Sequence, residues 1–480
     1  MFAAVGGVDR LSAESAYEED GLTTCDNSML KAIRSCLWRT PWLFAWIVAC
    51  VIAVPLLSFR TQSELIGCYL PAANRVAEGL ALPGSTTWVY PPFFTITVLP
   101  LVPIPLVAAR MLWSAMLITC SVVAVRFVWN TLMLDSRFRS AVCNPRLFFL
   151  FVGALALGAA GHVATPLSYQ AHDIWVLVLI TAGAWCYARA LIEPTEVATR
   201  WDTKVGVCFG LAASFKVMPV LFLPVLLAQR RWRAAFAMAL TGVAAAVSFD
   251  LLAIALTGQH HFAAWVELAR AGSDLTQSGG GRWPPWNPLN QSGTGILSRL
   301  LTPTPPALGL NFECMVIAVG SEGQRMLLSA WIATLVSALL LVVGLSRRAY
   351  GLAYGTPQAS AAIYALAVAG ATSCVYLLIA PHSSNYHFAP VGLAVAASLA
   401  WIITRGVDTT VVVCLALMVL MELIPGRDVL GNRWRDILLA CGLIGACALL
   451  GFISCSRICI LAARECRAGV GCSAGAASPQ

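Results

Sequence analysis

One acidic residue lies just beyond the first long apolar stretch of the chain. The stretch from Pro41 to Phe59 carries no charged residue, and Glu64 follows five positions later. An apolar run of about twenty residues can cross the hydrocarbon core of a bilayer, so Glu64 is expected at the boundary between lipid and water. A carboxylate there could act as a general base on a substrate that is carried by a lipid. The alternative is an ordinary loop carboxylate.

The residues after Glu64 are patterned like a helix that lies in the membrane interface. Apolar and polar side chains alternate at helical spacing as far as Glu78, which is typical of interfacial helices. Tyr69 and Arg75 lie in this stretch and are candidate substrate contacts. Tyr90 precedes two prolines, which fix the backbone and would hold the Tyr90 hydroxyl in one place. A simple turn at the start of a helix is the alternative for this motif.

Lys216 is an isolated cation in an apolar region that prolines interrupt. It is one of three lysines in the chain, and Pro219 and Pro224 follow it closely. A lysine inside the membrane is costly and usually pairs with an anion or faces a water-filled cavity. We favour a lipid phosphate as that anion. A protein carboxylate is the alternative, with three candidates: Asp173, Asp250 and Glu422.

Further polar residues fall in three short segments on the same expected side of the membrane. Taken singly, each is more often structural than functional, and their shared side is what makes them candidates for substrate binding. The three segments contain His162, Gln170, His172 and Asp173; then Asn290, Gln291, Ser292 and Arg299; and finally Tyr386 and His387.

The composition indicates a membrane protein that must position these groups with helices. Hydrophobic residues make up 59% of the chain, charged residues 11%, and the mean hydropathy is +0.77. A soluble domain has about 25% charged residues. We therefore expect an all-α polytopic membrane protein with about 11–13 transmembrane helices, each long enough to cross the bilayer. The expected spans are 40–59, 105–130, 147–166, 173–192, a broken pair at 204–215 and 217–229, 233–256, 327–346, 360–380, 387–404, 409–424 and 437–456.

Arginine and lysine placement sets the expected topology. With the N-terminus in the cytosol, short cytosolic loops collect most basic residues, as the positive-inside rule requires. The stretch 93–102 is too short to cross and is expected to lie along the interface. Two long loops, about 60–104 and 257–326, then lie outside. We expect a membrane domain at 36–460, with disordered cytosolic segments at 1–35 and 461–480.

Several classes of function lack their sequence signals. The chain has no Walker loop, which argues against ATP hydrolysis, and no D-x-D motif that would suggest a metal-bound nucleotide sugar. We expect no metal site, no cofactor and no nucleic-acid partner. Most of the 17 cysteines lie in apolar runs, where they act as small hydrophobic residues.

Taken together, the motifs resemble glycosyltransferase family 87 (DUF2029), the membrane mannosyltransferases of the GT-C superfamily. The resemblance runs from about residue 40 to 405, and no single motif is specific. The motifs are Y-L-P-A-A-N-R-V-A-E-G after the acid, Y-P-P-F-F-T-I-T-V-L-P-L, A-A-R-M-L-W, Y-Q-A-H-D, A-S-F-K-V-M-P-V-L-F-L-P followed by R-R-W-R-A, N-Q-S-G-T-G-I-L-S-R-L-L, and S-S-N-Y-H-F.

The resemblance implies a GT-C bundle with interfacial helices in the first extracytoplasmic loop. It also implies metal-independent, inverting transfer of a sugar, typically mannose, from a polyprenyl-phosphate donor to a glycan or glycolipid acceptor. The enzyme would lie in the plasma membrane with its active site outside and both termini cytosolic. Glu64 would be the base, and Lys216 and Arg299 would stabilise the leaving phosphate.

The chain departs from the family pattern at two positions. The family usually has an aspartate in the first outer loop where this chain has Glu64, and a G-Q pair where this chain has Tyr169-Gln170. The extra methylene of Glu64 would move the carboxylate by about 1.5 Å unless the backbone compensates, and shifts of that size can be costly in catalysis.

Two other functions are alternatives to this one. A secondary transporter or lipid flippase often has repeated halves with interrupted helices at matching positions. Here the interrupted segment around Lys216 has no counterpart elsewhere in the sequence, and the long loops fall on one side, which favours the transferase. Transfer of another sugar, or transfer to protein, remains open.

Overall fold

The computed structural model describes residues 41–80, 90–258, 260–272, 287, 289–301, 319–351, 360–423 and 437–475. Within these residues the regular secondary structure is helical. Contacts divide the chain into Met1–Ala49 and Cys50–Gln480. The second unit holds every element described below except the start of the first helix. The expected N-terminal segment 1–35 lies outside the described residues.

The first half of the chain builds long helices joined by short ones. In order they are α2 (Pro41–Ser58), η2 (Leu65–Tyr69), α3 (Leu70–Ala77), α4 (Phe93–Val98), η3 (Leu99–Leu101), α5 (Leu106–Leu132), α6 (Ser136–Val142), α7 (Pro145–Ser168), α8 (Asp173–Ile192), α9 (Thr195–Phe215), η4 (Met218–Leu221) and α10 (Phe222–Ala228).

The second half continues the bundle. Its elements are α11 (Trp232–Thr257), α12 (Phe262–Gly272), α13 (Gly293–Leu301), α14 (Ser321–Gly351), α15 (Ala361–Ile379), η6 (Asn385–Phe388), α16 (Val391–Arg405), α17 (Thr409–Leu423) and α19 (Leu443–Gly475). Helix α19 continues through 461–475, a segment that we expected to be disordered.

Eight helices in the described residues are long and apolar enough to cross a membrane. Three shorter apolar helices also occur, at Trp46–Ser58, Met218–Ala228 and Thr409–Leu423. An all-helical polytopic protein is therefore confirmed, and the expected range of about 11–13 spans requires the shorter helices to cross as well. The long helices are α5, α7, α8, α11, α14, α15, η6 with α16, and α19.

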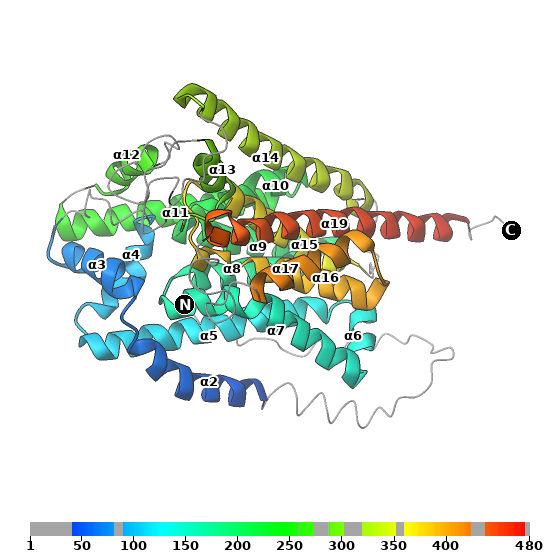
Figure 1. The fold of residues 1–480 in the computed structure, drawn as a ribbon, viewed down its shortest axis with the longest axis horizontal. Coiled ribbons are helices and arrows are strands. Elements are labelled where there is room, and N and C mark those ends of the chain that lie inside the picture. Colours follow the sequence, from blue (N-terminus) through cyan, green and yellow to red (C-terminus); the bar gives the residue numbers. More distant parts are fainter. Residues whose placement is uncertain are drawn as a thin grey trace. The chain divides into compact units, whose positions relative to one another are not determined.

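Helix α15 forms the centre of the bundle. It contacts α8, α14, α16 and α19 (Figure 1), and most of its side chains are buried. The alanines and the one glycine of its sequence let neighbouring helices approach closely, which drives helix packing in membranes. A Cβ at Gly370 would lie 2.9 Å from the Cys455 Sγ on α19.

Local sequence explains where several of these helices begin and end. Asn144 accepts a hydrogen bond from the Arg146 N–H at 2.9 Å, and Pro145 opens α7, a favourable arrangement at a helix start. The end of α11 is set by Gly258, whose φ of 70° lies in the left-handed region. The run 93–102 forms the short α4 and η3, separate from α5, as the sequence predicted.

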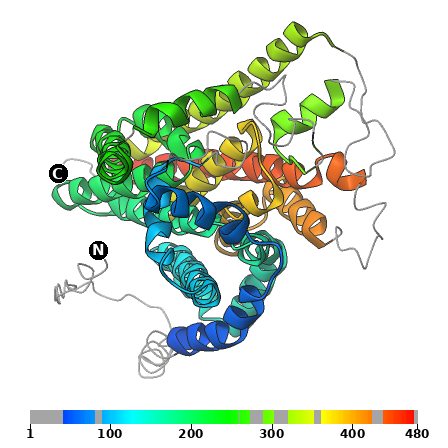
Figure 2. The same cartoon turned by 90° about the vertical axis from the view of Figure 1, so that its left-hand side faces the viewer.

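One end of the bundle carries the short helices of the first loop. Figure 2 faces this end, with α5 and α11 seen almost along their axes and α3 lying across it. Helix α3 contacts α4 and α11. The end of α7, the start of α8 and the end of α9 meet at this end, because α7, α8 and α9 run antiparallel in succession.

Ion pairs gather toward the opposite end. Arg405 pairs with the buried Asp135 at 2.7 Å and with Glu465 at 3.4 Å. Arg457 pairs with Asp408 at 2.9 Å. These pairs join three parts of the bundle: the region between α5 and α6, the end of α16, and helix α19. They lie far from the end that carries the short helices of the first loop.

Candidate active site

Glu64 is held by its backbone and by both carboxylate oxygens. Its N–H donates to the Tyr169 carbonyl at 2.9 Å. The Tyr386 hydroxyl donates to Oε1 at 3.1 Å, and the Tyr90 hydroxyl donates to Oε2 at 3.4 Å. The two tyrosines are separated by nearly three hundred residues, so the fold brings together two of the residues that the sequence predicted with Glu64.

The segment after Glu64 is a single π-helical turn, η2, that turns Tyr69 into the core. The Tyr69 hydroxyl lies 2.9 Å from the His172 Nδ1, and its ring packs edge-on against Phe94 and Trp113. Burial, together with the nearby Glu64 and Asp173 carboxylates, raises the pKa of Tyr69 well above its usual value. The phenol therefore stays protonated and donates to His172.

His172 is neutral at physiological pH. Burial lowers the pKa of His172 to about 4, and the charge of Lys216 contributes to that shift, while Asp173 opposes it. A neutral imidazole has one donor and one acceptor nitrogen. The Tyr69 bond assigns Nδ1 as the acceptor, so Nε2 carries the proton. His172 is 0% exposed, and it links Tyr69 of the first loop to the start of α8.

Lys216 forms an ion pair with Asp173. The Lys216 Nζ lies 2.5 Å from the Asp173 Oδ1, and the His387 Nε2 lies 3.9 Å from the Asp173 Oδ2. Burial lowers the pKa of the Lys216 amine, and the Asp173 and Glu64 carboxylates oppose that shift. In the structure the partner of Lys216 is therefore a protein carboxylate, the alternative to the lipid phosphate that the sequence favours.

The position of Lys216 follows from the break between α9 and η4. Its backbone is extended, with φ −152° and ψ 125°, and Pro219 follows in η4. The sequence predicted this interruption. Helix α9 packs very closely on α11, since a Cβ at Gly206 would lie 2.2 Å from the Ala234 carbonyl oxygen and one at Gly210 would lie 2.7 Å from that of Met238. This close approach holds α9 against α11, and the extended backbone of Lys216 ends the helix.

The site has two carboxylates in different surroundings. Glu64 accepts hydrogen bonds from neutral phenols, whereas Asp173 faces a lysine and a histidine. A neighbouring ammonium favours the charged form of a carboxylate and makes it a weaker base. Asp173 is accordingly the counterion of Lys216.

The side-chain donors of a second group of predicted residues bind backbone carbonyls. The Asn290 Nδ2 donates to the Pro381 carbonyl at 2.8 Å, and the Gln291 Nε2 donates to the Leu439 carbonyl at 2.7 Å. The Arg299 guanidinium donates to the carbonyls of Asn287, Asn290 and Ala440. Asn290, Gln291 and Arg299 are at most 1% exposed. These bonds hold the segment 287–301 in place, which favours a structural role for Arg299 over the phosphate contact that we expected.

Glycine is required where this segment folds back on itself. A Cβ at Gly295 would lie 2.4 Å from the side-chain Cγ of Asn290. Asn290 in turn accepts the Ser383 N–H at 3.0 Å. Since Tyr386 and His387 follow shortly after Ser383, the segment 287–301 supports the turn that delivers both residues to Glu64 and Asp173.

Two other predicted residues lie apart from these contacts. Arg75 is exposed on α3, whereas the next residue, Val76, is buried. His162 lies 3.3 Å from Glu422, a partner on α17. That pair is separate from the bonds that join Glu64 to Tyr90 and Tyr386.

Two residues have a larger part in the site than the sequence predicts. Asp173 is predicted only as a possible partner for Lys216 and a member of a polar segment, and in the structure it is the carboxylate between Lys216 and His387. Tyr169 was noted only as a departure from a family motif. Its carbonyl binds the Glu64 N–H, and its ring lies 5.5 Å from that of Tyr386. The sequence feature that could have identified Asp173 as a site residue is its position directly after His172.

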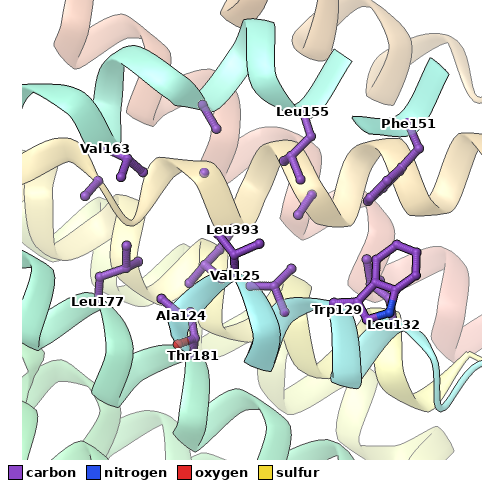
Figure 3. A pocket seen from close by; sticks show the side chains of 15 residues that line it. Ala124, Val125, Trp129, Leu132, Phe151, Leu155, Val163, Leu177, Thr181 and Leu393 are labelled. Atoms are coloured by element: carbon purple, nitrogen blue, oxygen red, sulfur yellow. The ribbon is translucent and has the colours of Figure 1, made fainter. Parts of the chain in front are cut away.

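An apolar cavity of about 100 Å³ lies between α5, α7, α8 and α16. Figure 3 shows Leu155 and Val163 of α7 facing Leu177 and Thr181 of α8 across it. None of the sequence-predicted residues lines it. In the described residues, no group of three His, Cys, Asp or Glu side chains is placed to hold a metal ion.

Comparisons with known proteins place the chain in a family. The model of glycosyltransferase family 87 matches residues 88–354, a range that contains Tyr90, His172, Asp173 and Lys216 but not Glu64. No curated protein matches the sequence. The crystal structure of ArnT from Cupriavidus metallidurans bound to undecaprenyl phosphate matches with a TM-score of 0.36 and 11% sequence identity, over 89% of this chain and 78% of that chain. Since the family match covers more than half of the sequence, the chain belongs to glycosyltransferase family 87 and is a membrane glycosyltransferase, as its motifs predicted.

Proposed function

We propose that the protein transfers a hexose from a polyprenyl-phosphate donor to a hydroxyl group of a glycan or glycolipid, and that this hexose is mannose. The reaction inverts the anomeric centre and takes place on the extracytoplasmic face of the plasma membrane. Family membership supports sugar transfer. The donor class, the sugar and the inverting course are those that the motif resemblance implies.

The observation that carries this proposal is the arrangement around Glu64. A carboxylate held by two phenols lies in the same cluster as a buried lysine, and each influences the other electrostatically. Inverting transfer needs a base on one face of the sugar and stabilisation of the leaving group on the other. Glu64 and Lys216 supply one group of each kind.

In the proposed reaction the Glu64 carboxylate takes the proton of the acceptor hydroxyl. The acceptor oxygen attacks the anomeric carbon as the bond from that carbon to the phosphate oxygen breaks. The electron pair of that bond leaves with the polyprenyl phosphate. General-base assistance of this kind contributes roughly 100- to 10,000-fold to a rate.

Lys216 stabilises the departing phosphate. An ammonium group has three N–H donors, so its bond to Asp173 is compatible with a further bond to a phosphate oxygen. Placing positive charge where negative charge develops is among the largest contributions to enzymatic rate. His387 lies on the other side of Asp173, and its Nδ1 accepts the Ser384 N–H at 3.2 Å, so Nε2 carries a proton that it can donate.

Tyr90 and Tyr386 hold the carboxylate and contact the sugar or the acceptor next to it. Their hydroxyl groups set the direction of both Glu64 oxygens. This arrangement compensates for the extra methylene of Glu64, because the longer side chain places its carboxylate between the two phenols. Asn290 and Gln291 act in the proposal through the segment that carries Tyr386, and Arg75 remains a candidate contact for the lipid phosphate or the acceptor.

The test is incubation of the purified protein with radiolabelled polyprenyl-phosphate mannose and a panel of glycan and glycolipid extracts. We expect the label to move to an acceptor in the wild-type protein and not in Glu64→Ala. A lipid-linked mannose that crosses proteoliposome membranes unchanged, with no labelled product, would instead support a flippase. Transfer of a different sugar from the same lipid would correct the donor and keep the mechanism.

A further inference from the structure

We infer that Gln170 is a positioning residue that sets the place of Glu64, and not a substrate contact as the sequence suggested. The inference rests on the proposed function, because it assigns Gln170 a part in placing the proposed base. Gln170 is 0% exposed, so its side chain is not available to a sugar or a phosphate in this structure.

The Gln170 amide links the base-bearing turn to α5. Its Oε1 accepts a short hydrogen bond from the Ser63 hydroxyl, directly before Glu64 in the chain. Its Nε2 donates to the Ser114 Oγ at 2.8 Å, and Ser114 is fully buried on α5. One side chain therefore ties the residue before the base to a rigid helix of the bundle.

The backbone on both sides of Gln170 is fixed as well. The Gln170 carbonyl accepts from the Trp113 Nε1 at 2.9 Å, and the preceding carbonyl, of Tyr169, accepts from the Glu64 N–H. Residues 63 and 64 are thus bound to residues 169 and 170 through a side chain and through the main chain. Loss of the side-chain bond leaves the Glu64 N–H bond to Tyr169 between these two pairs of residues, beside the bonds that Tyr90 and Tyr386 donate to the carboxylate.

The backbone conformation of Gln170 indicates that its side chain is needed. Its φ is 54°, in the left-handed region, where a residue other than glycine is uncommon. Glycine would adopt this conformation without the Cβ penalty. Gln170 adopts this conformation despite that cost, and its amide is the group that joins Ser63 to Ser114.

The placement predicts how activity responds when the link is broken. Methionine has a similar length and volume to glutamine but makes neither hydrogen bond. In Gln170→Met the base can drift away from the acceptor hydroxyl, while the groups around the donor phosphate are unchanged. Misplacement of a catalytic group by about 1 Å can cost roughly 100-fold in rate.

The experiment measures kcat and the donor KM for Gln170→Met, Ser63→Ala and the double variant, with polyprenyl-phosphate mannose and the acceptor found above. We expect Gln170→Met to lower kcat by about 10- to 100-fold with the donor KM within about twofold of wild type. Because both substitutions break the same bond, the double variant should be no slower than the slower single variant, the non-additivity expected of contacting residues.

A matched control is Gln229→Met. Gln229 is also buried and donates to the Tyr364 hydroxyl at 3.3 Å. Tyr364 packs near Tyr187, which lies about 21 Å along α8 from Asp173 at 1.5 Å per residue. This substitution removes a buried glutamine far from the base and should leave kcat unchanged.

The outcomes separate this inference from the proposed function. A wild-type protein that transfers no sugar defeats both. Transfer that Glu64→Ala abolishes but Gln170→Met leaves at the wild-type rate keeps the function and overturns the inference. Additive losses of kcat in the double variant also overturn it, since they indicate two independent structural defects. If Gln170→Met does not fold, Ser63→Ala decides alone, and a wild-type kcat there overturns the inference.

Discussion

Two polar clusters in this protein look alike in sequence and differ in what they bind. The base cluster consists of Glu64, to which Tyr90 and Tyr386 donate, and of the ion pair between Lys216 and Asp173, so its bonds run between side chains. The anchor cluster consists of Asn290, Gln291 and Arg299, and the side-chain donors of all three bind backbone carbonyls. Polarity does not tell the two clusters apart, and the groups that their donors bind do.

The difference has a physical reason. Backbone carbonyls at the ends of helices and in turns need donors when they are buried, and asparagine, glutamine and arginine are rich in donors. Side chains that satisfy such carbonyls are held by the fold. Ionisable side chains that face one another from five different segments can exchange partners or protons when a substrate arrives. The base cluster is suited to chemistry, and the anchor cluster is suited to holding η6 and the turn before it.

The largest expected effect is the loss of the base. Glu64→Ala should lower the rate of sugar transfer by roughly 100- to 10,000-fold, as expected for a general base, with little change in thermal unfolding. Glu64→Asp should retain part of the activity, because it keeps a carboxylate. The rest of the wild-type activity should be lost, because the shorter side chain cannot reach both phenols. Glu78→Ala is the matched control, since Glu78 is exposed after α3, and it should transfer at the wild-type rate. A fully active Glu64→Ala would remove the base cluster from the mechanism.

The next effect tests the cation. Lys216→Met should lower kcat by roughly 100- to 1,000-fold, the range found when one stabilising donor of a developing charge is removed. It also leaves Asp173 buried without its ammonium partner, so unfolding should occur at a lower temperature. Lys216→Met combined with Asp173→Asn should recover that temperature but not the activity. Recovery of both would show that Lys216 serves only to neutralise Asp173.

The anchor cluster should respond in the opposite way. Arg299→Met leaves three buried carbonyls without their donor, and we expect the free energy of unfolding to fall by about 3 kcal/mol, at about 1–3 kcal/mol for each unsatisfied buried group with partial compensation. The donor KM of the folded protein should stay near its wild-type value. A stable Arg299→Met protein with a strongly raised donor KM would return Arg299 to the phosphate site that the sequence suggested.

The smallest effect concerns pH. The pKa of His172 in the folded state is lowered to about 4 from an ordinary value near 6.5. Between these two pH values the imidazole is protonated in the unfolded chain and neutral in the folded protein. Its contribution to stability is therefore present above about pH 6.5 and is lost as the pH falls toward 4. Thermal unfolding of wild type and His172→Phe, measured between pH 7 and 4, should show a steeper loss in wild type. Parallel curves would contradict a buried neutral His172.

Local features of the fold followed directly from the sequence. The break at Lys216 was marked by Pro219, and the short helices at 93–101 were marked by an apolar run too short to cross and by the prolines around it. Both of these predictions need only the length of apolar runs and the chemistry of proline. For Tyr90, Tyr386 and Glu64 the sequence predicts a shared side of the membrane, and it does not predict the hydrogen bonds between them.

What could not be predicted depends on partners distant in sequence. The pairing of Lys216 with Asp173, and not with Asp250 or Glu422, is decided by the antiparallel packing of α8 and α9. The role of Arg299 is decided by carbonyls such as that of Ala440, about 140 residues away. The length of α19 differs from the prediction because its last part is rich in glycine and alanine, a composition that is typical of disordered tails.

The most direct test of the account is a structure of Glu64→Gln bound to polyprenyl-phosphate mannose. The amide keeps the shape of the carboxylate and cannot take the acceptor proton, so the donor should remain intact. We predict a phosphate oxygen within hydrogen-bond distance of the Lys216 Nζ and the anomeric carbon facing the Gln at position 64. A donor phosphate bound by Arg299, or a sugar on the far side of the bundle from Glu64, would contradict it.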